Sequence, residues 1–264
     1  PLDAAALDAE ATQLLAIAES SRALGHLSEY ERILRRLHTV APGHAPTAVA
    51  AARLHLDRGE AADAVFVLDA LIARGLDALP PRLRAEALYG RARAALAQGR
   101  VDAARDDLKA ALRAEPLHAE ALRAFAEVEA ARGQTAVAVE HLIRALVTED
   151  GPDERAALLF RMGLLWEDGL GDTREAGACY ELARGEGLAS RELMVRVLRH
   201  YQRSGALERG LEVVDSLLDA SSDDPAELAS LWFARGEILA GHAGREDDAI
   251  EAFDMALSYD PDLH

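Results

Sequence analysis

The stretch Ala85–Pro116 reads AEALYGRARAALAQGRVDAARDDLKAALRAEP and contains two amphipathic helices, a turn and a closing proline. Apolar residues in its first half recur at three- and four-residue spacing, as in a helix with one buried face. Gly99 ends this helix, because glycine adopts the left-handed backbone of a C-terminal cap without steric cost. A second helix follows, with Leu108 and Ala111 on one stripe, and Pro116 stops it because proline lacks a backbone N–H.

Glycines recur through the whole chain of 264 residues at Gly25, Gly59, Gly99, Gly133, Gly171, Gly205 and Gly244. Their spacings are 34, 40, 34, 38, 34 and 39 residues. A period near 34 indicates a helical-repeat solenoid, in which each short unit buries its apolar face against the next. The alternation favours units arranged in pairs, with random drift of loop insertions as the alternative.

Two kinds of residue repeat in phase with these glycines. The small residues of the second helices are Ala64, Ala104, Ala138, Ala176, Gly210 and Ala249. The bulky residues that follow them are Leu68, Leu108, Leu142, Tyr180, Val214 and Phe253. Close helix approach requires the small side chains, and the bulky ones fill the space beyond them.

This unit resembles the tetratricopeptide repeat (TPR), and the resemblance covers nearly the whole chain. It implies an all-α fold, a right-handed superhelical α-solenoid of antiparallel helix pairs with about seven repeats. The expected repeats, within a single solenoid over residues 1–264, are 11–44, 45–78, 85–118, 119–152, 156–190, 191–224 and 229–263.

Several positions depart from the family pattern. Tyr30 takes a small-residue position, which predicts splayed helices or an exposed edge in the first unit. The units around Gly171 and Gly244 each carry one extra residue before that glycine. The sequence stops directly after a second helix, which leaves Leu257 and Tyr259 partly bare. We therefore expect a fragment of a longer protein, or self-association through this last repeat.

The composition narrows the classes of partner. The formal charge of −17 argues against nucleic acid or an anionic membrane as the main partner, because like charges repel. No apolar stretch is long enough to span a bilayer. Arginine supplies nearly all the positive charge, with Lys109 the single lysine, which favours a GC-rich bacterial source. The compartment is left open by the sequence, with the cytoplasm slightly favoured.

The sequence contains no catalytic motif, so we expect neither an enzyme nor a bound cofactor or metal. Glycine-rich phosphate loops, zinc-protease motifs and calcium loops are all missing from it. His38 and His44 flank a Pro-Gly turn, where two histidines are more often ordinary surface residues than a pair of metal ligands. Cys179, the single cysteine, excludes an intrachain disulfide and a cysteine-based zinc site.

In the family that this chain resembles, the first helices line a concave groove. Carried over, the groove residues are Arg53, Tyr89, Arg93, Arg123, Phe160, Arg161, Arg196, Arg199, Arg203 and Phe233. Acidic residues on the same faces bring the groove near neutrality. The hypothesis is an extended peptide with acidic residues and an apolar anchor, held by arginine forks and aromatic faces. The alternative is that these arginines are solvated or paired with their acidic neighbours.

The function expected from the sequence is a protein–protein interaction scaffold that binds a peptide or protein partner in the groove. The alternative is a peptide-sensing regulatory module that controls an output domain outside this segment. Some relatives grip a terminal carboxylate with a Lys and Asn clamp. That clamp is not expected here, because the chain has no Asn and Lys109 falls on a second helix.

Overall fold

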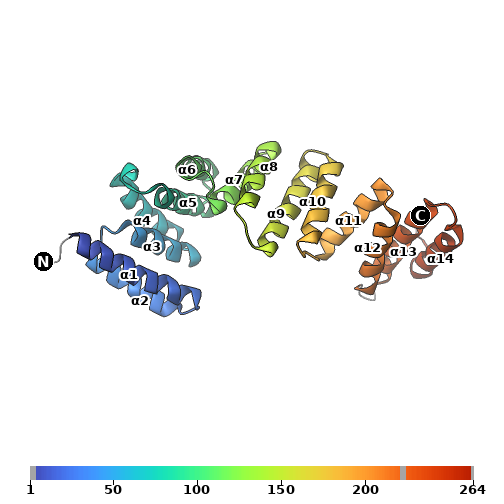
Figure 1. Cartoon of the computed structure of the whole chain (residues 1–264), viewed down its shortest axis with the longest axis horizontal. Coiled ribbons are helices and arrows are strands. Elements are labelled where there is room, and N and C mark those ends of the chain that lie inside the picture. The colour runs from blue at the N-terminus through green and yellow to red at the C-terminus, as the bar shows by residue number, and fades with distance from the viewer. Residues whose placement is uncertain (1–3, 221–223, 263–264) are drawn as a thin grey trace. The chain divides into compact units, whose positions relative to one another are not determined.

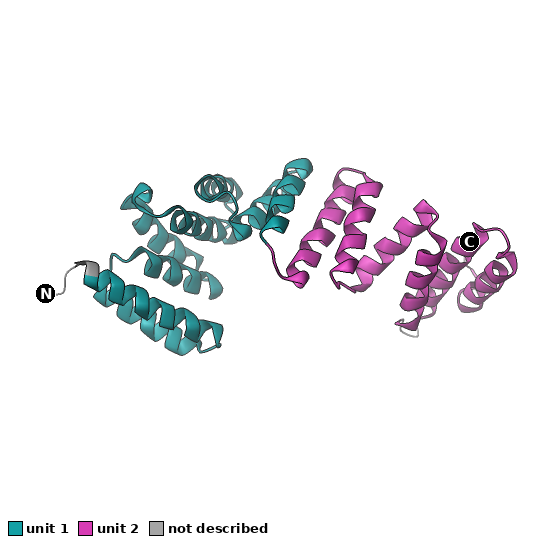
Figure 2. Ribbon diagram, in the orientation of Figure 1, with its two compact units in different colours: residues 1–148 teal, residues 149–264 magenta. Residues whose placement is uncertain are grey.

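The computed structural model describes residues 4–220 and 224–262, and the regular elements in these ranges are all helical. The chain divides into two compact units, residues 1–148 and residues 149–264 (Figure 2). Fourteen α-helices lie in the described ranges, and the predicted all-α fold is confirmed. Whether the chain forms one continuous solenoid, with the repeat bounds given above, stays a prediction.

Unit 1 contains four helix pairs, and Figure 1 shows their arrangement along the chain. Their bounds are α1 Ala4–Ala23, α2 Leu27–Val40, α3 Ala45–Asp57, α4 Ala61–Ala73, α5 Pro81–Ala97, α6 Val101–Ala114, α7 Ala119–Ala131 and α8 Thr135–Val147. A short 3-10 helix, Leu76–Ala78, precedes α5 in the long connection between the second and third pairs. Each odd-numbered helix packs against the next one along the chain, and α5 also packs against α3 and α7.

Unit 2 contains three helix pairs. Their bounds are α9 Pro152–Leu164, α10 Thr173–Gly185, α11 Arg191–Ser204, α12 Leu207–Asp219, α13 Pro225–Ala240 and α14 Glu246–Tyr259. A π-helical turn, η2 at Leu165–Gly169, continues α9 and contacts α10. Antiparallel pairing thus recurs in both units.

The periodic glycines occupy equivalent turns between the helices of each pair. All seven have a positive φ, between 69° and 85°. Because side chains are disfavoured in this region of backbone space, glycine is the residue that these turns require. The prediction that they end equivalent helices is confirmed.

Close helix packing depends on the small residues that the repeat predicts. Ala64, Ala104 and Ala138 have no exposed surface. A Cβ added at Gly163 of α9 would lie 2.3 Å from the ring of Tyr180. Two helices of a pair therefore approach until an aromatic ring of one rests on the backbone of the other.

The first helix pair differs from the sequence expectation. Tyr30 is only 1% exposed, and its hydroxyl donates a hydrogen bond to the Ala50 carbonyl oxygen at 3.2 Å. Ala18 of α1, also fully buried, belongs to the same apolar cluster. The expected exposed edge at Tyr30 is wrong, because small neighbours and a backbone acceptor accommodate the ring.

Candidate functional site

A cavity of about 700 Å³ opens on the first-helix face of unit 1. Side chains from α1, α3, α4, α5 and the start of α7 line it. The lining residues are Arg22, Val49, Ala52, Arg53, Leu56, Leu68, Arg82, Glu86, Tyr89, Gly90, Arg93, Glu115, Leu117, His118, Ala119 and Glu120. We call this cavity the unit 1 groove.

The unit 1 groove brings together three of the predicted site residues, Arg53, Tyr89 and Arg93. Arg53 projects from α3, and its Nη1 lies 3.7 Å from a carboxylate oxygen of Glu19. Arg93 projects from α5, and its Nη2 lies 3.7 Å from Asp57. Both distances exceed hydrogen-bond length, so the guanidinium groups are attracted to these acids without donating to them.

Tyr89 forms an aromatic wall of the unit 1 groove. Its ring centroid lies 5.4 Å from that of His118, and the Arg93 guanidinium carbon lies 6.0 Å from the tyrosine centroid. Burial raises the pKa of Tyr89, so the phenol stays neutral near pH 7. His118 caps α7 by accepting a hydrogen bond from the Ala121 N–H at its Nδ1, which fixes the ring in place. The Tyr89 ring is therefore a fixed, neutral aromatic surface beside the Arg93 guanidinium.

The charge of the unit 1 groove contrasts with that of the chain. Four arginines and three glutamates line it, whereas the whole chain carries a formal charge of −17. Arg82 is paired with Glu86 at 3.2 Å, and Arg22 lies 3.5 Å from Glu19. With Glu19 and Asp57 beside it, the groove is close to neutral, in a protein that is otherwise strongly acidic.

The remaining predicted site residue of unit 1 lies outside this cavity. Arg123 projects from α7 and is close enough to Tyr89 to lower the pKa of that phenol slightly, against the larger effect of burial. It does not line the groove.

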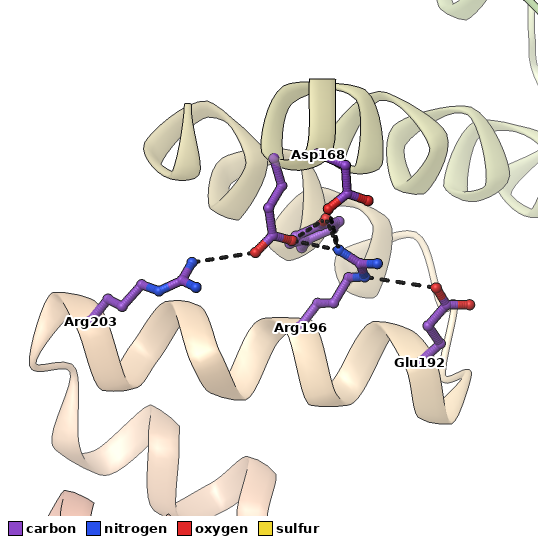
Figure 3. A network of polar contacts seen from close by, with 6 residues as sticks. Asp168, Glu192, Arg196 and Arg203 are labelled. Atoms are coloured by element: carbon purple, nitrogen blue, oxygen red, sulfur yellow. Dashed lines mark hydrogen bonds and ion pairs between the residues drawn. The ribbon is translucent and has the colours of Figure 1, made fainter. Parts of the chain in front are cut away.

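In unit 2, Arg196 of α11 belongs to a network of ion pairs and hydrogen bonds (Figure 3). Its Nη1 donates to Glu167 at 2.7 Å and lies 3.5 Å from Asp168, and its Nε lies 3.7 Å from Glu192. Arg203 donates to the other Glu167 oxygen at 3.3 Å. The Arg196 guanidinium is therefore surrounded by carboxylates of its own unit.

Tyr180 of α10 completes this network. Its hydroxyl donates to Glu167 at 2.8 Å, and its ring lies 6.0 Å from the Arg196 guanidinium carbon. Burial alone would raise the pKa of Glu167, but the hydrogen bonds from Tyr180, Arg196 and Arg203 outweigh it and hold the pKa below its usual value. The carboxylate is thus ionised and fully engaged at neutral pH.

The π-helical turn η2 places the acids of this network. It spans Leu165–Gly169, where the sequence carries one residue more than the standard repeat. A π-turn absorbs an inserted residue inside a helix and changes the direction of the side chains that follow. Glu167 and Asp168 lie in this turn and face α11. The π-helical turn therefore positions the two acids that neutralise Arg196.

The other predicted residues of unit 2 take no part in these ion pairs and hydrogen bonds, although Phe160 contacts the ring of Tyr180. The Phe160 and Phe233 rings pack against Tyr180 at 5.8 Å and Phe253 at 5.4 Å, within their own helix pairs. Arg161 lies on α9, half-buried. Arg199 is exposed on α11 and lines a cavity of about 470 Å³ between the ends of α11 and α13.

Sequence reasoning missed several residues of the unit 1 groove. Arg82 was missed because α5 begins at Pro81, four residues before the expected repeat. Leu117 and His118 were missed because they lie in the connection before α7, outside any first helix. The paired prolines Pro80 and Pro81 were the available signal, since proline is favoured at the first position of a helix.

Two further features bear on the class of protein. Within the described residues, one cluster of possible metal-ligand atoms occurs, formed by His55, Glu60 and Asp63. His55 Nδ1 already shares a hydrogen bond with Glu60 at 2.7 Å, which accounts for this arrangement without a metal. No helix in the described part of the chain combines the length and apolarity needed to cross a membrane.

The comparison with protein families identifies the repeat. The tetratricopeptide repeat model matches residues 49–116, 89–155 and 198–263, more than half of the chain. The chain belongs to the tetratricopeptide repeat family. TPR folds are typically noncatalytic scaffolds that bind proteins or peptides.

Solved TPR structures share the fold at low sequence identity. The C-terminal part of a TPR repeat-containing protein from Cytophaga hutchinsonii is 9% identical, with a TM-score of 0.60 over 94% of this chain and 96% of that one. A TPR protein from Parabacteroides merdae is 17% identical, with a TM-score of 0.53 over 95% and 93%. YrrB, described as a TPR protein with an unusual peptide-binding site, is 17% identical, with a TM-score of 0.52 over 67% and 86%. A search of curated proteins finds no significant match.

Proposed function

We propose that this protein is a noncatalytic scaffold that binds an extended segment of a partner protein in the unit 1 groove. The observation that carries the proposal is the pair Arg53 and Arg93, whose guanidinium groups line a cavity of about 700 Å³ without hydrogen-bonding to their nearest carboxylates. The solved structure of YrrB, a TPR protein with a peptide-binding site, supports this use of the fold.

The chemistry of the groove defines the partner segment. Arg53 and Arg93 favour carboxylate side chains, which arginine binds with two parallel hydrogen bonds. Val49, Leu56 and Leu117 offer an apolar surface beside them. The segment therefore carries acidic residues next to an apolar anchor. Because a flexible peptide loses conformational entropy on binding, we expect an affinity on the order of micromolar.

The experiment uses two labelled synthetic peptides and fluorescence anisotropy. One peptide alternates Glu and Leu, and the other has Lys in place of Glu. The double variant Arg53→Glu/Arg93→Glu is compared with Arg113→Glu/Arg174→Glu, which reverses two exposed arginines outside the groove. We expect the groove variant to bind the Glu–Leu peptide at least about tenfold more weakly, since one lost charged contact is worth about 1.4 kcal/mol or more.

Equal affinity of both variants for the Glu–Leu peptide would overturn the proposal. Equal affinity of the wild-type protein for the Glu and Lys peptides would overturn it too. The regulatory-module alternative requires an output domain outside this segment and stays a prediction.

A further inference from the structure

A second groove lies on the opposite side of α3 from the unit 1 groove. The α3 residues Val49, Arg53 and Leu56 face the unit 1 groove, whereas Ala51, Leu54 and His55 face the other side. At 100° per residue, these two sets lie on opposite faces of the helix. The second cavity has a volume of about 540 Å³ and is bounded by α2 and α4. We call it the outer groove.

The outer groove has an apolar floor and a basic rim. Leu34, Leu54, Val67 and Leu71 form the floor, and Phe66 stands at its edge with 77% of its surface exposed. The exposed ring continues the apolar floor to the surface and so enlarges the apolar area open to a partner.

Three arginines and one glutamate lie on the rim: Arg35, Arg58, Arg74 and Glu31. Glu31 is hydrogen-bonded to both Arg35 and Arg58, and these bonds lower its pKa to about 2. Arg74 donates to the Pro42 carbonyl oxygen at 3.1 Å and has no acidic partner within the described residues. The rim therefore keeps a net positive charge, in a chain of formal charge −17.

The last helix of the same chain presents the complementary surface. Ile250 and Leu257 of α14 are 58% and 44% exposed and lie seven residues apart, so they share one face of the helix. Asp254 lies between them on this face, with Asp247 and Glu251 at its margin. All three acids are exposed, and none forms an ion pair within the part of the chain that the structure describes.

We propose that the outer groove binds the outward face of α14 from a second copy of this chain. Ile250 and Leu257 are spaced as anchors of a helix that lies in an apolar groove, and the acids between and beside them meet the arginine rim. The contact is heterologous, because each copy offers its groove to one neighbour and its α14 to another. A single helix face buries little area, so the association is weak and depends on concentration.

Variants at exposed positions test this contact without disturbing the core. Phe66→Glu places a charge at the groove edge, and Ile250→Glu places one on the α14 face. Val147→Glu on α8 and Leu182→Glu on α10 are matched controls, since both side chains are exposed and lie outside both surfaces. Circular dichroism checks that each variant keeps its helix content.

Sedimentation velocity over a wide range of concentrations measures the association. We expect the wild type and both controls to self-associate, and Phe66→Glu and Ile250→Glu each to lower the association constant at least about tenfold, because each removes an apolar contact and places a charge against the apolar floor. An equimolar mixture of these two variants forms a heterodimer and nothing larger, since one intact groove and one intact α14 remain. Added salt weakens the association.

Three results would each overturn the proposal. The first is a wild-type protein that stays monomeric at every concentration. The second is a loss of association in the controls as large as that in the two test variants. The third is a mixture of Phe66→Glu and Ile250→Glu that does not form a heterodimer. The proposed function does not depend on these results, because the unit 1 groove is on the other side of α3.

Discussion

In unit 1, Arg53 and Arg93 lie 3.7 Å from their nearest carboxylates and border an open cavity. In unit 2, Arg196 donates to Glu167 at 2.7 Å and is only 19% exposed. All three arginines lie on first helices and were predicted to line the groove. The difference shows that a repeat position gives an arginine its place on the fold, while the neighbouring helix pair decides whether its donors are engaged.

The largest expected effect concerns one glycine in a first helix of each unit, Gly163 of α9 and Gly90 of α5. At Gly163 an added Cβ would lie 2.3 Å from the Tyr180 ring, whereas at Gly90, which lines the unit 1 groove, it would lie 3.2 Å from a methyl group of Leu68. We expect Gly163→Ala to lower the free energy of unfolding by about 3 kcal/mol, because the ring has to move. Gly90→Ala stays within about 1 kcal/mol of the wild type, since the gain in helix propensity offsets a small shift of Leu68.

Urea unfolding followed by circular dichroism measures both variants. If Gly163→Ala changed the free energy of unfolding as little as Gly90→Ala does, the Tyr180 ring would be free to move aside. The predicted difference in packing between the two sites would then be wrong.

The next effect concerns the carboxylates that face the arginines. We expect Glu167→Gln to destabilise the protein by about 2 kcal/mol, because Arg196 and Tyr180 lose an ionised acceptor in a half-buried site. Glu19→Gln, which removes the charge facing Arg53, costs less than about 0.5 kcal/mol because the two groups are 3.7 Å apart and each side chain is about a third exposed. Thermal unfolding at neutral pH distinguishes the two variants. Equal shifts in Tm would contradict the predicted difference between Glu167 and Glu19.

The pH dependence of stability follows from the same carboxylate. The pKa of Glu167 in the folded protein lies below its usual value of 4.5, so the unfolded chain binds its proton more readily. The stabilisation is complete above about pH 4.5 and is lost as the pH falls through the lower folded value. We therefore expect the stability difference between the wild type and Glu167→Gln to shrink on acidification below that pH. A difference that stays constant down to the acid limit would show that Glu167 is not ionised in the network.

The smallest expected effect is on the stability of the unit 1 groove. Arg53→Gln/Arg93→Gln changes the free energy of unfolding by less than about 0.5 kcal/mol, because each side chain is more than a third exposed and only loosely paired. Denaturant titration of this variant checks the value. A decrease of several kcal/mol in the free energy of unfolding would mean that these arginines stabilise the fold, which would contradict their proposed role in binding a partner.

Much of the fold was predictable because its signals are local. Gly99 and its equivalents need a positive φ, and Pro116 stops the helix that precedes it, whatever lies nearby in space. The candidate site was predictable only in part. Arg53, Tyr89 and Arg93 meet in one cavity as the repeat implied, but Arg82 and His118 join them from a longer helix and from a connection.

The sequence by itself determined the helix pairs, their turns and the face on which each arginine lies, because helix periodicity and glycine backbone freedom act over a few residues. Only the tertiary structure decided which arginines are neutralised. One extra residue became the π-helical turn that brings Glu167 to Arg196, a contact across 29 positions of sequence. Such contacts depend on the approach of separate helices, and their distances are fixed by packing between helix pairs.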